Sequence, residues 1–219
     1  MLLLATDTSG KDGSIALAQC GPDDECKILD VVPLAGGTFS AQLVPQIAGL
    51  LQEHGFTRGD IGAFAVASGP GSFTGLRVGL AAIKALAEVL HKPIAAVSLL
   101  EAVGVAAGTE SVLAVLDAGR GEFYVGEWDG GVLSRESLLT GLELLEQAKG
   151  RLVVTPDPAV ASNLRSANLI VQEVPRQRSD AVARLGWKKI QAGDTVSPAD
   201  LEANYIRRSD AEIFAKPHT

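Results

Sequence analysis

The sequence has little cysteine, no long hydrophobic run and fewer basic than acidic residues, and each shortage excludes a class of protein. Its only cysteines, Cys20 and Cys26, have the spacing of neither paired zinc ligands nor a CxxC redox motif, which predicts reduced, structurally incidental thiols in a cytosolic protein. No stretch of about 18 residues is free of charges and turn residues, so we expect no membrane-spanning helix. Because Met1–Asp7 carries no positive leader, we also expect no signal peptide.

The charge balance argues against a protein that holds nucleic acid by itself. The 219 residues include 19 Lys and Arg against 26 Asp and Glu, a net charge of −7. Proteins that bind tRNA or DNA neutralise phosphates with basic side chains, so any nucleic acid is expected to be held by another subunit. A hydrophobic content of 47% suffices for a substantial core, in one large domain or in two lobes of about 100 residues each.

Hydrophobic periodicity predicts strands and helices in two similar halves. In the first half we expect strands at 2–7, 14–18, 27–34, 61–67 and 93–97, and helices at 38–54, at 73–90 and just before Gly108. In the second half we expect strands at 111–117, 122–128, 152–155 and 169–174, helices at 141–149 and 179–192, and a loop at 155–168. Asp7 and Asp117 each end an apolar strand before a glycine turn, which indicates two lobes of related topology, residues 1–108 and 109–219.

The segment Ser68–Leu80, SGPGSFTGLRVGL, lies between a predicted strand and a predicted helix and contains four glycines. It lacks the lysine of a Walker loop, and Thr74 stands where the dinucleotide fingerprint needs its third glycine. Two interpretations remain for this loop. It is either a tight turn that packs backbone against backbone, or a generic anion site in which Gly69 and Gly71 let a ligand approach the helix N-terminus.

The helix expected at 73–90 carries more apolar surface than a surface helix of a monomer needs. One stripe consists of Leu76, Leu80, Ile83, Ala87 and Leu90, and a second stripe, on another side, consists of Val78, Ala82, Ala85 and Val89. Either the helix is buried within its own lobe, or one face meets the core and the other meets a partner protein. We favour the partner.

Four motifs spread over nearly the whole chain resemble those of the TsaB (YeaZ) family. They are Asp7-Thr-Ser-Gly with Ser14-Ile-Ala-Leu, the segment Ser68–Gly79, Leu116-Asp-Ala-Gly-Arg-Gly-Glu-Phe-Tyr124, and Asn204-Tyr-Ile-Arg207. The resemblance implies the two-lobed actin-like ATPase fold of sugar kinases, chaperones and actin. In this α/β fold each lobe is a mixed sheet of ribonuclease H-like topology with flanking helices.

The resemblance also implies a function and a set of partners. Members of the family are non-catalytic subunits that stabilise and activate TsaD, the glycoprotease-like enzyme that transfers a threonylcarbamoyl group to the adenosine beside the tRNA anticodon. TsaD is bound through helices of the first lobe, the ATPase TsaE joins them, and tRNA is reached through the complex. Because the second apolar stripe would otherwise be exposed, the chain alone is expected to form a homodimer through Phe73–Leu90. The expected interface residues are Phe39, Leu43, Ile47, Phe73, Leu76, Arg77, Val78, Leu80, Ala81, Ala82, Ala85 and Val89.

A phosphate hairpin of actin-like kinases has its match at the end of the first strand. The matching residues are Asp7, Thr8, Ser9 and Gly10, which we expect to be vestigial, and Gly69 and Gly71 are weaker candidates. We expect this chain to require no cofactor of its own, and ATP or ADP to bind only in the assembled complex.

The metal site implied for TsaD has no counterpart here. TsaD holds its metal with a His-x-x-x-His pair, whereas no two of His54, His91 and His218 are four residues apart. The matching region offers Ser40, Val44 and Gln46 instead. We therefore expect no metal ligands and no catalytic residues in this chain.

Two other functions stay open. An actin-like small-molecule kinase would use Asp7 and Asp117 around Mg-ATP, although both acids could simply cap their turns through side-chain hydrogen bonds. A peptidase is suggested by names given to glycoprotease-like relatives, but the sequence has no metal pair or Ser-His-Asp order to support it. A small basic cluster near the C-terminus could contact a partner or tRNA; it comprises Arg207, Arg208, Lys216 and His218.

Overall fold

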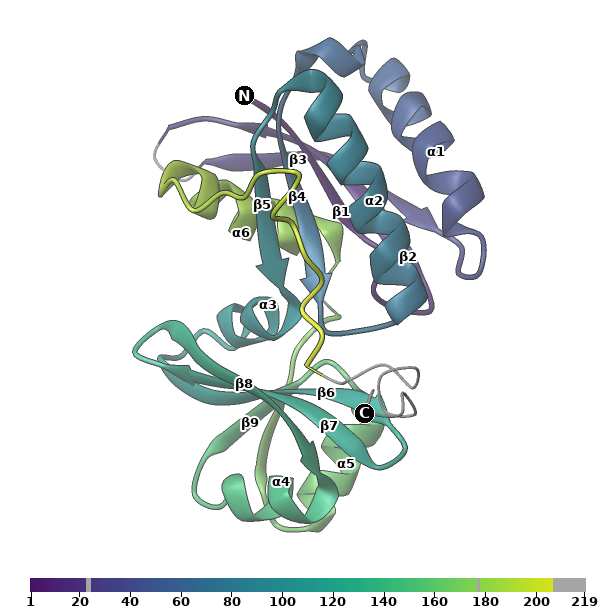
Figure 1. The fold of residues 1–219 in the computed structure, drawn as a ribbon. Helices are drawn as coiled ribbons and strands as arrows, with labels where there is room; N and C mark the ends of the chain where they lie inside the picture. The colour runs from purple at the N-terminus through teal and green to yellow at the C-terminus, as the bar shows by residue number, and fades with distance from the viewer. Residues whose placement is uncertain (23–24, 177, 207–219) are drawn as a thin grey trace, which may run out of the picture.

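Two five-stranded mixed sheets, one in each lobe, form the framework of the protein (Figure 1). The computed structural model describes residues 1–22, 25–176 and 178–206. The first sheet, in the order β3-β2-β1-β4-β5, is built from β1 (Leu2–Asp7), β2 (Gly13–Cys20), β3 (Cys26–Leu34), β4 (Ile61–Gly69) and β5 (Ile94–Ser98). The second, in the order β10-β9-β6-β7-β8, is built from β6 (Ser111–Gly119), β7 (Glu122–Asp129), β8 (Val132–Thr140), β9 (Leu152–Thr155) and β10 (Ile170–Glu173).

The two sheets share one topology. In each sheet three strands form an antiparallel meander, and two further strands are added in parallel to the first strand of that meander. The expectation of two lobes with related topology is therefore confirmed at the level of the sheets.

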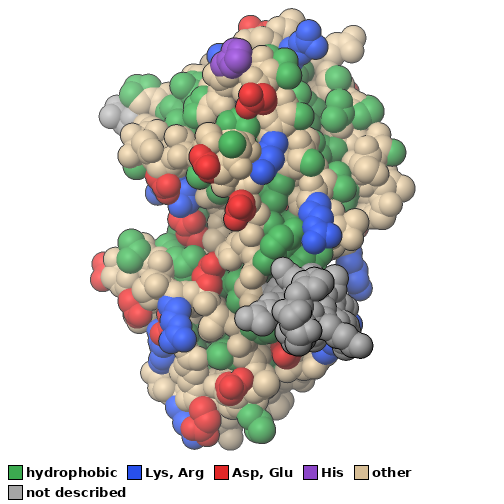
Figure 2. All heavy atoms as spheres, viewed as in Figure 1, with side chains coloured by type: hydrophobic (Ala, Val, Ile, Leu, Met, Phe, Trp, Pro, Cys, Tyr) green, Lys and Arg blue, Asp and Glu red, His purple; other side chains and the backbone are tan. Residues whose placement is uncertain are grey.

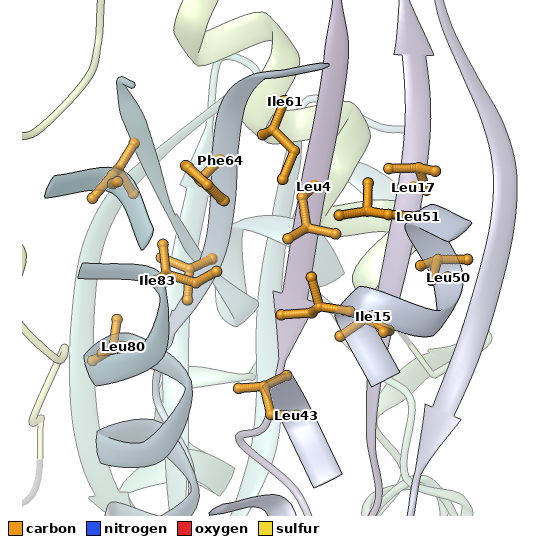
Figure 3. Close-up of a cluster of buried hydrophobic side chains, with 14 of the residues drawn as sticks. Leu4, Ile15, Leu17, Leu43, Leu50, Leu51, Ile61, Phe64, Leu80 and Ile83 are labelled. Atoms are coloured by element: carbon orange, nitrogen blue, oxygen red, sulfur yellow. The ribbon is translucent and has the colours of Figure 1, made fainter. Parts of the chain in front are cut away.

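Helices α1 (Phe39–Glu53) and α2 (Phe73–Leu90) cover one face of the first sheet. Their large apolar side chains point into a common core with those of the strands, as Figure 3 shows for Leu4, Ile15 and Leu17 opposite Leu43 and Ile83. The short 3-10 helix η1 (Arg58–Asp60) links α1 to β4. Both long helices lie where the periodicity placed them, because each has a stripe of bulky residues at helical spacing.

Helix α6 (Ser179–Gln191) covers the other face of the first sheet, which corrects the expected lobe boundaries. Gly186 lies directly on Ala65 of β4, and Val196 forms an antiparallel bridge with Ile94 at the start of β5. The division at residue 108 therefore holds for the strands but not for the last described part of the chain, which returns to the first lobe. The physical reason is that this face of the sheet is lined by small side chains, among them Ala5 and Ala16, while α1 and α2 cover the opposite face and α3 contributes only Leu99 and Ala102 here.

The second sheet is covered by α3 (Leu99–Ala106) on one face and by α4 (Gly141–Gln147) and α5 (Pro158–Ser166) on the other. The sequence analysis missed β8 and wrongly assigned α5 to a loop. Strand β8 lies at a sheet edge and is half exposed, so it lacks a clean apolar alternation. Helix α5 buries little and starts at the N-cap Asp157 followed by Pro158, a pair that also occurs in turns.

The lobes are joined by α3 and by the segment 201–206, which runs from α6 across to the second lobe (Figure 1). The backbone N–H of Asn204 donates a hydrogen bond to the carbonyl of Ser68 at 2.7 Å. The Asn204 amide and the Ser98 hydroxyl both donate to the carboxylate of Glu136 in β8. Glu136 of the second lobe thus binds both the end of β5 and the segment 201–206. Among the described residues, no helix is long and apolar enough to cross a bilayer.

The close contact of α6 with the first sheet makes Gly186→Ala destabilising. An added Cβ would lie 2.4 Å from the Ala65 Cβ, so we expect a loss of about 1–3 kcal/mol of unfolding free energy despite the better helix propensity of alanine. The matched control is Gly49→Ala in α1, where an added Cβ meets no atom within 4 Å and a gain of about 0.5–1 kcal/mol is expected. Urea denaturation measures both, and equal effects would contradict this packing of α6.

Candidate functional site

An open cleft of about 880 Å³ lies between the lobes and receives the turns that follow β1 and β6. The first lobe contributes Ser9, Gly10 and Gly71, and the second contributes Asp117 and Tyr124. A smaller adjoining cavity of about 330 Å³ reaches Asp7 and Arg176. The fold therefore brings the matching hairpins of the two lobes to one place, as it does in actin-like proteins that hold a nucleotide there.

The buried Asp7 carboxylate is engaged by its own turn. One of its oxygens accepts hydrogen bonds from the Ser9 backbone N–H at 2.9 Å and from the Ser9 hydroxyl at 2.6 Å. Burial raises the pKa of Asp7 above its ordinary value, against the Ser9 hydrogen bonds and the charge of Arg176, which lower it. The acid thus caps the β1–β2 turn, one of the two roles that the sequence left open for it.

The glycine loop packs against the hairpin that would otherwise receive a phosphate. The Thr8 hydroxyl donates to the Gly75 carbonyl at 2.7 Å, and the Ser72 N–H donates to the Ser9 carbonyl at 2.7 Å. A Cβ at Gly75 would lie 2.0 Å from the Thr8 carbonyl oxygen, so only glycine allows this approach. These contacts favour the backbone-packing interpretation of the loop over the anion site.

The other candidates for a phosphate site, Gly10, Gly69 and Gly71, also lie close to other atoms of the chain. The Arg176 guanidinium lies over Gly10, where an added Cβ would be 2.2 Å from its nitrogen. Gly71 lies against Ser9, and Gly69, with a φ of +121°, lies beneath Asn204 at the other end of the loop. The structure therefore brings Asp7, Thr8, Ser9, Gly10 and Gly71 together, with Gly69 apart from them.

Asp117 is exposed on the cleft and also caps its turn, accepting a hydrogen bond from the Gly119 N–H at 2.8 Å. The smaller cavity is lined by three acids, Asp7, Asp117 and Asp157, and by one cation, Arg176. Carboxylates repel a phosphate unless a cation intervenes. No group of three His, Cys, Asp or Glu side chains that could hold a metal ion occurs within residues 1–22, 25–176 and 178–206.

An apolar surface lies on the side of α1 and α2 that faces away from the sheet, and we call it the α1/α2 face. Figure 2 shows mostly hydrophobic and uncharged atoms over α1, at the upper right, and scattered blue and red side chains over α2. Val44 is 54% exposed and Val89 is 72% exposed, and α1 carries no charged residue before Glu53. The face comprises Ala41, Val44, Pro45, Ala48, Val78, Ala81, Ala82, Ala85 and Val89, of which Val78 and Ala82 are half-buried.

Part of the expected interface was wrong, because five of its residues belong to the core of the lobe. They are Phe39, Leu43, Ile47, Leu76 and Leu80, all less than 9% exposed. The sheet takes the bulkier stripe of each helix and leaves the smaller side chains outside, since large apolar groups gain most from burial. Phe73, Arg77, Val78, Ala81, Ala82, Ala85 and Val89 are exposed or half-buried, as the interface requires.

The sequence analysis missed two features of this surface. The α1 contribution, Ala41, Val44, Pro45 and Ala48, was signalled by the near absence of charge in that helix. The second feature is Tyr205, whose ring packs against Phe73 with 4.9 Å between centroids. The Arg77 Nε donates to the Tyr205 hydroxyl at 3.1 Å, so the first turn of α2 is held by the segment 201–206. Arg207 and the rest of the basic cluster lie outside the described residues.

Sequence comparisons place the chain beside tRNA-modification proteins. Residues 31–143, just over half of the chain, match the family model described as TsaD: tRNA N6-adenosine threonylcarbamoyltransferase. The TsaB protein of Bacillus subtilis, a "tRNA threonylcarbamoyladenosine biosynthesis protein", is 34% identical over 129 residues, which are 58% of this chain and 54% of the relative. An uncharacterised Mycobacterium tuberculosis protein is 30% identical over 178 residues, 80% of this chain and 77% of the relative. The matches span about half the length of the TsaB relatives.

Solved structures show the same fold. YeaZ from Pseudomonas aeruginosa superposes with a TM-score of 0.70 at 22% identity, over 93% of this chain and 100% of that one. The ethanolamine utilization protein EutJ from Carboxydothermus hydrogenoformans superposes with a TM-score of 0.52 at 13% identity, over 84% of this chain and 89% of that one. The paired lobes of one topology define a two-lobed actin-like protein, as expected. The chain belongs to the family of the threonylcarbamoyltransferase TsaD. Within this family it resembles the TsaB (YeaZ) members.

Replacing the buried acid by its amide, which can still accept the Ser9 hydrogen bonds, tests whether burial raises the pKa of Asp7. Because burial holds the folded-state pKa of Asp7 above the unfolded value of 3.8, the folded chain pays for an ionised carboxylate at neutral pH but not below pH 3.8. Asp7→Asn should therefore raise Tm at pH 7, and the gain should shrink as pH falls towards 3.8. Thermal melts across this pH range measure it. A gain that grows on acidification would contradict the assignment.

Proposed function

We propose that this chain is a non-catalytic, cytoplasmic partner subunit that binds and activates a TsaD-type enzyme for threonylcarbamoylation of the adenosine beside the tRNA anticodon. The observation that carries the proposal is the α1/α2 face. It is apolar although it lies on the surface of the lobe, α1 contributes no charged residue to it, and the exposed Arg77 and Glu88 of α2 border it. Small side chains such as Ala81, Ala82 and Ala85 let a partner helix approach closely, and exposure of such a surface costs about 25 cal/mol per Å².

The proposed contact is a packing of α1 and α2 against the matching pair of helices on TsaD. Family membership supports this arrangement, because two proteins of one fold present equivalent helix pairs to one another. The same face would be covered by a second copy when the chain is alone, which gives the proposed homodimer.

The chemistry is assigned to the partner. This chain lacks the His-x-x-x-His pair expected of TsaD, and Ser40, Val44 and Gln46 lie exposed on α1 in its place. The net charge of −7 supports a role in which TsaD holds the tRNA. TsaE is proposed to join the assembled pair, and ATP or ADP to bind only there, because the β1–β2 hairpin here is occupied by Gly71, Gly75 and Arg176.

A charge placed on the α1/α2 face should weaken the complex. Ala85→Glu in α2 and Val44→Glu in α1 would bury an unpaired carboxylate at the contact, so we expect Kd for TsaD to rise about 30-fold or more. Leu142→Glu in α4 is the matched control, because Leu142 is 79% exposed in the second lobe and should leave Kd unchanged. Calorimetry with purified TsaD measures Kd, and sedimentation of the chain alone should show a dimer that both face variants convert to monomer.

Two outcomes would contradict this interface. One is unchanged TsaD binding in both face variants, and the other is a wild-type chain that is monomeric at micromolar concentration. Reconstituted tRNA modification, with TsaD and threonylcarbamoyl adenylate supplied, tests the activating role separately. Modification at full rate without this chain, or turnover by this chain alone, would exclude it.

The alternative of a small-molecule kinase is favoured by one observation, that Asp7 and Asp117 line the same cavity. Because Gly71 and Arg176 lie against the hairpin and three acids but only one cation line the cavity, we expect no tight binding of Mg-ATP by the isolated chain. Calorimetry with Mg-ATP checks this. Tight binding that is lost in Asp7→Ala would favour the kinase over the partner subunit.

A further inference from the structure

Two thiols face each other at one end of the first sheet. Cys20 is the last residue of β2 and Cys26 the first residue of β3, and the two are direct partners in the antiparallel ladder. Their sulfur atoms are 3.1 Å apart. Cys20 is 3% exposed, whereas Cys26 is half-buried, so a small reagent meets Cys26 first.

The surroundings distinguish the two sulfurs. The hydrogen bond with Cys20 and the positive charge of Arg184 lower the pKa of Cys26, with burial acting in the opposite direction. Arg184 belongs to α6, and its Nη1 donates to the Cys26 carbonyl at 3.0 Å. The pKa of Cys20 is raised by the same thiol–thiol hydrogen bond and by burial. Cys26 is therefore the more acidic thiol and, since Cys20 is buried, also the more accessible one, which makes it the nucleophile of the pair.

The backbone allows a bond between these sulfurs without rearrangement. Direct partners in an antiparallel ladder have Cα atoms about 4.5–5.5 Å apart and side chains on the same face of the sheet. Disulfides form at Cα separations of about 4.4–6.8 Å, with a sulfur–sulfur bond of about 2.05 Å. The two sulfurs need only to approach each other by about 1 Å, which side-chain rotation supplies.

We propose that Cys20 and Cys26 are a dithiol site that a hydroperoxide oxidises to a reversible intramolecular disulfide. The Cys26 thiolate attacks the peroxide, which gives a Cys26 sulfenic acid and, after protonation, water or an alcohol. The Cys20 sulfur then attacks the sulfenic sulfur and expels its hydroxyl group, which leaves as water with the Cys20 proton. Two thiols and one hydroperoxide thus give one disulfide, one water and the reduced peroxide. The inference rests on the thiol geometry and is independent of the proposed function.

The full-length protein tests the proposal, because these are its only two cysteines. After treatment with hydrogen peroxide, alkylation with iodoacetamide and intact-mass measurement should show both thiols lost together in a monomeric chain, and both regained with dithiothreitol. Closing the short loop between residues 20 and 26 should raise Tm by about 5 °C relative to the reduced protein. A covalent dimer on a denaturing gel, sulfinic acid as the first product, or two thiols that still alkylate would overturn it.

Two near-isosteric variants test the assignment of roles. In Cys20→Ser, Cys26 has no thiol partner, so a sulfenic acid should accumulate and be trapped by dimedone. In Cys26→Ser, Cys20 should react at least about tenfold more slowly, because its sulfur is buried and a reagent reaches it less easily. Equal rates in the two variants would contradict Cys26 as the nucleophile. The disulfide itself is read from the wild-type chain, which does not depend on how either variant folds.

Discussion

The close approach of the glycine loop to the β1–β2 hairpin is the constraint on which the rest of the first lobe depends. Gly75 can lie on the Thr8 carbonyl only because it has no side chain, and the Thr8 hydroxyl then bonds the Gly75 carbonyl. This pair of contacts fixes both the position and the rotation of the first turn of α2. Once that turn is fixed, Leu76 and Leu80 must face the sheet, and Ala81 and Ala85 must face away from it.

The same contact explains why one fold can lose one function and support another. In an actin-like protein the hairpin after the first strand is available to a phosphate, whereas here Gly71, Gly75 and Arg176 lie against it. The Ser9 N–H and hydroxyl, which could bind an anion, donate instead to the Asp7 carboxylate. These contacts support the proposal that the lobe meets a partner through the outside of two helices, whose position is set by the contacts at the hairpin.

Many of the helices and strands could be predicted from the sequence, and the predictions that were wrong or incomplete have physical causes. Elements with a strong local pattern, such as α2 and β6, were placed within one or two residues, because periodicity reflects burial directly. The position of α6 could not be found in this way, since a helix pattern does not say which of two sheets it covers. The loop glycines were recognised, but their purpose depends on Thr8 and Ser9, which lie some sixty residues earlier in the chain. Periodicity gave the two faces of α2 without telling which one the sheet would take.

The two faces of the first sheet now have separate roles. The α1/α2 side carries the bulky core and, beyond it, the proposed partner surface, whereas Cys20 packs on the α6 side with Ala16 and Val182. Oxidation of the dithiol would tighten the β2–β3 edge without touching any residue of the α1/α2 face. A redox effect on partner binding would have to pass through the strands themselves, because α1 rests on β2 and β3. Since the two strands are already paired at these residues and the sulfurs need to approach by only about 1 Å, the dithiol is better suited to stabilising the lobe than to switching its interface.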